Sequence, residues 1–111
     1  MSMVARRSFA LFGGLFVAAC LSPTLPLPPP SEPEVSGPTE QGLIRLTGNA
    51  PGGAWMYALN KTSNVGVFNR ATPEGRYDLE IPAEVGHRIA LWYELDGEQS
   101  ESLLFTVRTR P

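Results

Sequence analysis

Few side chains in this 111-residue sequence have the types and spacing that enzyme or metal chemistry requires. There is one cysteine, Cys20, and one histidine, His87, so an intramolecular disulfide and a Cys/His zinc site are both excluded. A serine nucleophile would need to lie in a sharp strand-to-helix turn beside a base, and no serine has that context. His87 follows Gly86 at an expected strand start, where we expect a solvated turn residue rather than a general base or a metal ligand.

The acidic residues form neither a recognisable catalytic pair nor a cation loop. Asp96, Glu98 and Glu101 lie close together, but calcium needs about six to eight oxygens from a shaped loop, so we expect a solvated acidic turn. Asp78 and Glu80 share one outward strand face with no sign of a cleft, which argues against paired carboxylates for glycoside cleavage. We therefore expect no enzyme activity, no cofactor and no metal.

Cys20 ends an N-terminal segment that has the layout of a secretory signal peptide. Arg6 and Arg7 precede an uncharged, mostly apolar run from Ser8 to Ala19. The run is shorter than the roughly 20 residues that a membrane-spanning helix needs. The segment therefore predicts export rather than a membrane span.

Val17-Ala18-Ala19-Cys20 resembles the lipobox of bacterial lipoproteins, an aliphatic residue and two small residues before a cysteine. The resemblance implies that residues 1–19 are removed by cleavage between Ala19 and Cys20, and that Cys20 carries palmitate-type acyl chains. An ordinary signal peptide that leaves a free thiol is the alternative. Leu21, where aspartate would favour the inner membrane, implies an outer-membrane anchor facing the periplasm or the cell surface of a bacterium.

Residues 20–41 are expected to join the lipidated cysteine to the folded part as a Pro-rich spacer. Seven of the 11 prolines lie here, and proline lacks the amide donor that a helix or a central strand needs. The composition predicts a semi-rigid polyproline II segment. At about 3.1 Å per residue, such a spacer would hold the folded part tens of Å from the bilayer.

Residues 42–111 alternate short β-rich runs with Gly, Pro, Asn and Asp, which predicts an all-β domain. Asp96-Gly97 between two apolar runs predicts a hairpin. The spacing of the runs predicts a small antiparallel Greek-key sandwich of about six or seven strands. The expected strands are 43–48, 54–60, 64–70, 76–81, 88–95 and 102–108, with a short extra strand near 98–100.

Alternating apolar residues indicate which strand faces are buried. On this pattern the sets expected to share a face are Trp55, Tyr57 and Leu59; Tyr77, Leu79 and Ile81; Ile89, Leu91 and Tyr93; and Leu103, Phe105 and Val107. The same alternation leaves Trp92 and Met56 on outward faces, where they are candidate ligand contacts. The alternative is that both faces of the sheet are covered, or that Trp92 closes one end of the sandwich.

The run from Gly48 to Trp55 and the run from Gly75 to Ile89 resemble bacterial Ig-like and carboxypeptidase-regulatory-like repeats. Ser100, just before the last strand, matches a serine that is common there. The resemblance covers residues 43–108 and implies an Ig-like or prealbumin-like fold, because its motifs are turn and core positions. His87 departs from the pattern, which often has aspartate at that place.

Composition and charge narrow the functional classes. The net charge is −2, and it becomes −4 once Arg6 and Arg7 are removed, which argues against a nucleic-acid surface. The leading hypothesis is an envelope lipoprotein, held at the membrane by its lipid, that displays the domain for contact with an envelope protein. The alternatives are a module that binds peptidoglycan or another polysaccharide, and an envelope enzyme or inhibitor.

Overall fold

Strands make up all the regular secondary structure of residues 26–109, which are the residues that the computed structural model describes. Within this range no helix is long and apolar enough to cross a membrane. The strands are β1 (Glu34–Ser36), β2 (Leu43–Asn49), β3 (Trp55–Asn60), β4 (Val65–Arg70), β5 (Arg76–Pro82), β6 (Arg88–Leu95), β7 (Glu98–Gln99) and β8 (Leu103–Thr106).

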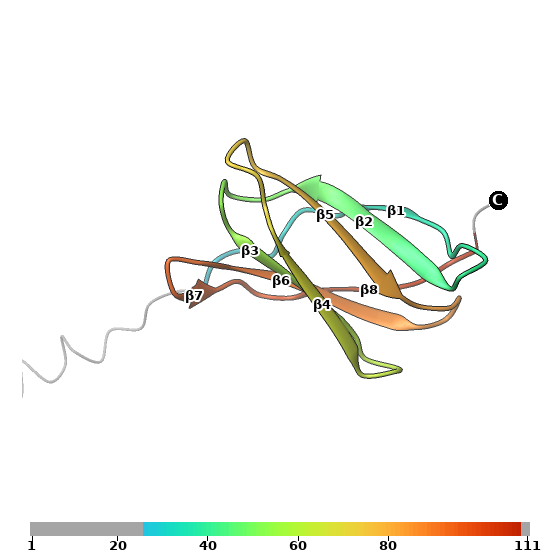
Figure 1. Cartoon of the computed structure of the whole chain (residues 1–111). Coiled ribbons are helices and arrows are strands. Elements are labelled where there is room, and N and C mark those ends of the chain that lie inside the picture. Colours follow the sequence, from blue (N-terminus) through green and yellow to red (C-terminus); the bar gives the residue numbers. More distant parts are fainter. Residues whose placement is uncertain (1–25, 110–111) are drawn as a thin grey trace, which may run out of the picture.

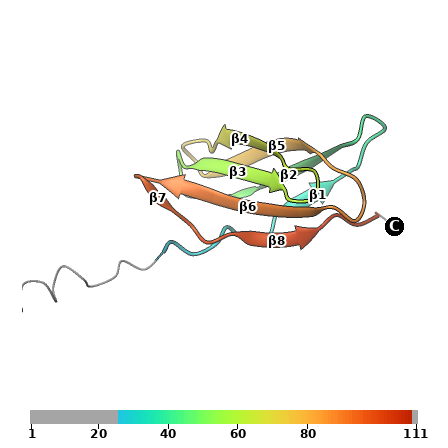
Figure 2. The same ribbon diagram turned by 90° about the horizontal axis from the view of Figure 1, so that it is seen from below.

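The strands form two antiparallel sheets that pack as a small β-sandwich, as the sequence predicts (Figures 1 and 2). One sheet has the order β1-β2-β5. In the other, β4, β3 and β6 lie side by side, and β6 pairs in turn with β7 and β8. The chain crosses between the sheets after β2, β4 and β5, so strands that follow one another in sequence are split between the layers.

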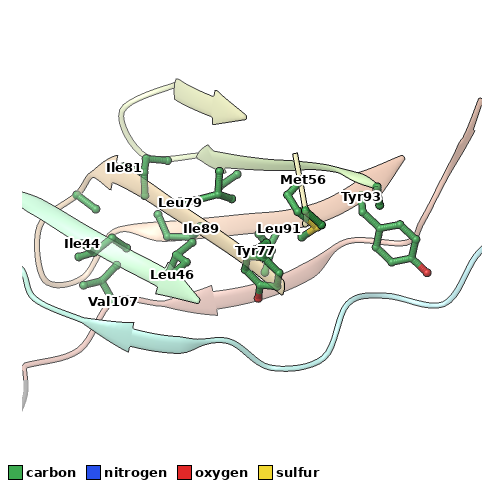
Figure 3. Packing of buried hydrophobic residues seen from close by; sticks show 14 residues of the cluster. Ile44, Leu46, Met56, Tyr77, Leu79, Ile81, Ile89, Leu91, Tyr93 and Val107 are labelled. Carbon is green, nitrogen blue, oxygen red and sulfur yellow. The ribbon is translucent and has the colours of Figure 1, made fainter. Parts of the chain in front are cut away.

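The core lies between the sheets and is built largely from alternate residues of β5 and β6. Tyr77, Leu79 and Ile81 of β5 are buried, and the residues between them are exposed, which confirms the prediction for this strand. The predicted set on β6 is buried as well. Figure 3 shows side chains from both sheets meeting in this layer, among them Leu46 of β2 and Leu91 of β6.

The predicted faces of β3 are wrong. Met56, which was expected to be exposed, is completely buried, whereas Trp55 and Tyr57 lie on the outer surface. The strand sequence WMYALN is apolar on both faces, so alternation alone does not say which face turns inward. Pairing with β6 decides the matter, because Met56 lies opposite Tyr93 and therefore shares its inward face.

Part of the predicted Pro-rich spacer belongs to the sandwich. Leu27 forms a parallel bridge with Ser100, and its carbonyl accepts the amide hydrogen of Glu101 at 2.9 Å. Further along, β1 pairs with β2 as an edge strand, a position that tolerates neighbouring prolines because one side of it needs no ladder bonds. The sandwich therefore includes Leu27 and β1, which the prediction assigned to the spacer.

The hairpin predicted at Asp96-Gly97 is confirmed and joins β6 to β7. Both turn residues have positive φ, 53° and 80°, as a two-residue hairpin turn requires. Ser100 follows β7, and its Oγ accepts the amide hydrogen of Tyr93 at 3.0 Å while donating to the Glu101 carbonyl at 2.9 Å. The serine side chain thus keeps β6 hydrogen-bonded where β7 ends and β8 has not begun.

Asn60 is a completely buried polar residue that joins two turns of the fold. Its Nδ2 donates to the Pro82 carbonyl at 3.0 Å and to His87 Nδ1 at 2.9 Å. Its Oδ1 accepts the amide hydrogens of Thr62 and Ser63 at 3.0 and 3.1 Å. All four hydrogen-bonding positions of this amide are used, so the end of β3 is fixed against both the β3–β4 turn and the β5–β6 turn.

Tyr77 packs over Gly48, its partner on β2. A Cβ at position 48 would lie 2.7 Å from the Tyr77 hydroxyl oxygen, so a glycine is required for this close approach. The hydroxyl is buried and has no hydrogen-bond partner among the described residues. Burial raises the pKa of Tyr77 to about 12, because the anion would lose its solvation.

We expect Asn60→Ala to lower the free energy of unfolding by about 3 kcal/mol, because two amide hydrogens, a carbonyl and an imidazole nitrogen lose their partner. Asn69→Ala is the matched control, since Asn69 is exposed and we expect a loss below about 1 kcal/mol. Urea unfolding of the mature chain measures both values. Equal losses in the two variants would contradict the role assigned to Asn60.

The raised pKa of Tyr77 predicts that the free energy of unfolding falls at high pH. An unfolded tyrosine ionises near pH 10, whereas folded Tyr77 has a pKa of about 12. Between these values the unfolded chain releases a proton that the folded chain retains, so the free energy of unfolding falls as the pH rises. Tyr77→Phe should remove this part of the fall while leaving stability at pH 7 nearly unchanged. Denaturant melts from pH 8 to 12 test it, and identical pH profiles for the two proteins would argue against it.

Candidate functional site

The predicted cleavage and acylation residues, Ala19 and Cys20, lie outside the described residues. The remaining candidates all fall within residues 26–109, so the structure locates each of their side chains.

His87 is a structural residue of the β5–β6 turn. Its ring is half-buried, and Nδ1 accepts hydrogen bonds from Asn60 Nδ2 at 2.9 Å and from the Glu84 amide at 3.2 Å. Because two donors point at Nδ1, a neutral ring carries its hydrogen on Nε2. In the part of the chain that the structure covers, no group of three or more His, Cys, Asp or Glu side chains could hold a metal ion.

Asp78 and Glu80 lie on the outer face of the β1-β2-β5 sheet, as the alternation of β5 predicts. Asp78 forms a two-point ion pair with Arg45, in which Nε donates to Oδ1 at 2.8 Å. The hydrogen bond from Arg45 lowers the pKa of Asp78 below its usual value. The carboxylate is therefore occupied by a surface pair and does not face a second acid across a cleft.

Three aromatic rings form a row across the outer face of the other sheet. Phe68 on β4 and Trp92 on β6 both lie opposite Tyr57 on β3. Tyr57 and Trp92 stack, with centroids 5.5 Å apart and planes 12° apart, and Phe68 lies 6.0 Å from Tyr57 on the other side. Phe68 has 66% of its surface exposed, so one end of the row is open to water.

Trp55 extends this row toward the start of β3. Its ring meets Phe68 edge-on at a centroid distance of 6.0 Å. The Arg70 guanidinium lies 5.5 Å from the Trp55 ring centroid, within reach for a cation–π contact, and its Nε donates to the Gly53 carbonyl at 3.0 Å. Arg70 is thereby held against the aromatic rings.

Aliphatic side chains continue the same surface in the other direction. The next cross-strand row places Leu59 of β3 beside Ala90 of β6, and Ala90 beside Leu104 of β8. Half of the Leu104 surface is exposed. We name the whole surface the aromatic face, and it comprises Trp55, Tyr57, Leu59, Phe68, Ala90, Trp92 and Leu104.

Glu94 is the acidic residue in the cross-strand rows of this face, opposite Trp55. Its Oε1 accepts a long hydrogen bond, 3.3 Å, from the Tyr57 hydroxyl. Loss of solvation, and then the nearby Glu94 carboxylate, raise the pKa of Tyr57 above its ordinary value. Tyr57 therefore presents a neutral hydroxyl at physiological pH.

The outer face of the β1-β2-β5 sheet is chemically different. Its central cross-strand rows carry no aromatic ring and consist of Glu34, Ser36, Arg45, Thr47, Asp78 and Glu80. One outer surface of the sandwich is thus an ordinary solvated face. The other carries a row of apolar side chains in which Trp55, Phe68 and Leu104 are exposed, and exposed apolar groups that cluster in this way mark binding surfaces.

Of the two predicted contact residues, the structure brings only Trp92 to this surface. Met56 lies in the core, on the opposite side of β3. The sequence argument missed Trp55, Tyr57 and Phe68 as outer residues, since it assigned the aromatic rings of β3 to the core. The sequence of β3 could have indicated this outer surface. A strand that is apolar on both faces can turn only one of them toward the core, so the other must be an apolar outer face.

A shallow groove lies between β1 and β8. It is lined by Glu32, Val35 and Gly37 on one side and by residues 104–109 on the other. These lining residues contain neither a histidine nor a pair of acids, so the groove offers no catalytic arrangement.

No protein-family model, curated protein or solved structure matches this chain. The small β-sandwich is therefore established by its own strand pairing, and the Ig-like and carboxypeptidase-regulatory-like resemblance stays a prediction.

Proposed function

We propose that this chain is a bacterial envelope lipoprotein, anchored through acylated Cys20, whose β-sandwich binds a partner protein through the aromatic face. The anchor is supported by the lipobox-like Val17-Ala18-Ala19-Cys20. The binding role is supported by one structural observation, the outward row of exposed Phe68 and half-buried Tyr57 and Trp92. The central rows of the other sheet's outer face are polar.

The aromatic face has the composition of a protein contact. Trp, Tyr and Arg are the residue types that dominate binding energy in protein interfaces, and Trp55, Tyr57, Trp92 and Arg70 all lie here. Covering apolar surface is worth about 25 cal/mol per Å², so an exposed ring such as Phe68 gains from a partner that excludes water. The stacked Tyr57–Trp92 pair is already rigid, which limits the side-chain entropy lost on binding.

A polysaccharide is the second candidate ligand. Sugar rings bind by packing their C–H faces against free aromatic ring faces. Tyr57 and Trp92 cover one face of each other, which favours the protein partner over the sugar. Phe68 supports the sugar, because its ring is the most exposed of the row.

The lipid, rather than surface charge, would hold the protein at the membrane. Each buried acyl CH₂ contributes about 0.8 kcal/mol, and two or three chains give stable attachment. The mature chain carries seven basic and 11 acidic side chains, a net of −4, so anionic lipid does not attract it overall. Leu21 after the cysteine supports the outer membrane as the location.

We expect Cys20→Ala to abolish incorporation of labelled palmitate and to release the protein from the membrane fraction. Ser22→Ala is the control and should retain both the label and the membrane location, because it leaves the lipobox-like run intact. Metabolic labelling followed by fractionation measures both properties. Palmitate incorporation by the Cys20→Ala protein would contradict acylation at Cys20.

We expect Phe68→Ser to reduce recovery of cross-linked envelope proteins about tenfold, since it removes the most exposed ring of the face. Val85→Ser is the matched control, because Val85 is also exposed but lies in the β5–β6 turn, off the aromatic face. If instead Phe68→Ser reduces pull-down on purified peptidoglycan and leaves protein cross-links unchanged, the ligand is the polysaccharide.

A further inference from the structure

Charge is divided unevenly between the aromatic face and the rest of the domain. Arg70 and Arg88 point outward from the strands of this face, and Lys61 directly follows β3. Glu94 points outward from β6, and Asp96 directly follows that strand. These five side chains have a net charge of +1. The other described residues carry nine acidic and three basic side chains, a net of −6.

The charged side chains lie at the two ends of the apolar surface. Arg70 flanks the Trp55 end, where Glu94 and Asp96 line the same hollow. Arg88 lies at the opposite end, where its carbonyl accepts the Lys61 amide hydrogen at 2.7 Å. A surface that complements this arrangement has an apolar centre and acidic residues beside Arg88 and Lys61.

The domain is also held close to the proposed anchor. Because Leu27 already pairs with Ser100, the chain between Cys20 and Leu27 has seven Cα–Cα steps and reaches at most about 25 Å. From Leu27, successive neighbours across the sheet are Ser100, β6, β3 and β4, four strand spacings or roughly 19 Å. Phe68 on β4 therefore lies within about 45 Å of Cys20.

The bilayer itself and a second copy of this chain both fit the aromatic face poorly. Asp96, Glu98 and Glu101 lie at the end where Leu27 enters, so anionic lipid repels the end of the domain nearest the membrane. A symmetric pair would bring two positive aromatic faces together, because a two-fold interface uses the same patch on both subunits.

We propose that the aromatic face docks onto a different protein held in the same membrane, through a contact surface that has an apolar centre and acidic residues opposite Arg88 and Lys61. This inference rests on the proposed function, because the distance argument assumes acylation at Cys20. It adds the chemistry of the partner and its position relative to the bilayer.

The experiment places a photo-reactive benzoylphenylalanine at position 68 of the full-length chain in its native membrane. We expect a protein adduct whose yield falls about tenfold in Arg88→Glu. Arg76→Glu is the matched control, because Arg76 is equally basic and exposed but belongs to β5 on the other sheet, and its yield should not change. Thermal melts of both variants establish that they fold.

A second arm tests the position of the partner. Twenty residues of alternating Ala and Pro inserted after Leu21 would lengthen the tether by about 60 Å. We expect this insertion to abolish the adduct while the protein stays acylated. Persistence of the adduct at an unchanged yield would overturn a partner held at the same membrane.

Other outcomes each overturn the docking proposal in a recognisable way. Equal adduct yields from Arg88→Glu and Arg76→Glu would overturn the charge complementarity. The absence of a protein adduct, or an adduct made of two copies of this chain, would overturn the partner. Flotation of the unacylated Cys20→Ser protein with phosphatidylethanolamine–phosphatidylglycerol vesicles, if Phe68→Ser abolishes it, would show that the face binds lipid instead. Absence of acyl chains on Cys20 of the wild-type protein is a separate result, and it refutes the anchor rather than the surface.

Discussion

The pairing of β3 with β6 sets the character of the whole molecule. It places Met56 opposite Tyr93 and Ala58 opposite Leu91, so the smaller and more flexible side chains of β3 fill the core. A slip of one residue would turn Trp55 and Tyr57 inward and drive two large rings into space that now holds a methionine and an alanine. Asn60 fixes the end of this strand through four hydrogen bonds, which makes the observed register the one in which its buried amide is satisfied.

Because of that register, the two sheets have different outer surfaces. Both contribute apolar residues to the shared core, but only one keeps aromatic rings on its outer side. The polar sheet gives an ordinary soluble surface, on which Arg45 and Asp78 pair in water and add little stability. Folding does not require these outer rings, and the surface that they form has a basic end, at Arg88 and Lys61, on a domain that is otherwise acidic.

How far the sequence predicts this structure depends on how many faces of each strand are apolar. On β5, charged residues alternate with Tyr77, Leu79 and Ile81, so the buried face is unambiguous and the prediction is confirmed. On β3 the alternation is absent, and only the partner strand decides. β1 escaped prediction because Glu34–Ser36 is a three-residue edge strand among prolines, held by pairing with β2 rather than by its own pattern. Trp92 was placed on the correct side of β6, while its stacking on Tyr57 required the register.

The bridge between Leu27 and Ser100 determines where a pulling force on the N-terminal chain enters the domain. Tension on the N-terminal chain enters the sandwich at this contact, where the Leu27 carbonyl is bound to the Glu101 amide, before it reaches β1. β6 supports this point through Ser100 and also pairs with the strand that carries Tyr57. A pull on the N-terminal chain is thus borne first by the same sheet that carries the aromatic rings on its outer side.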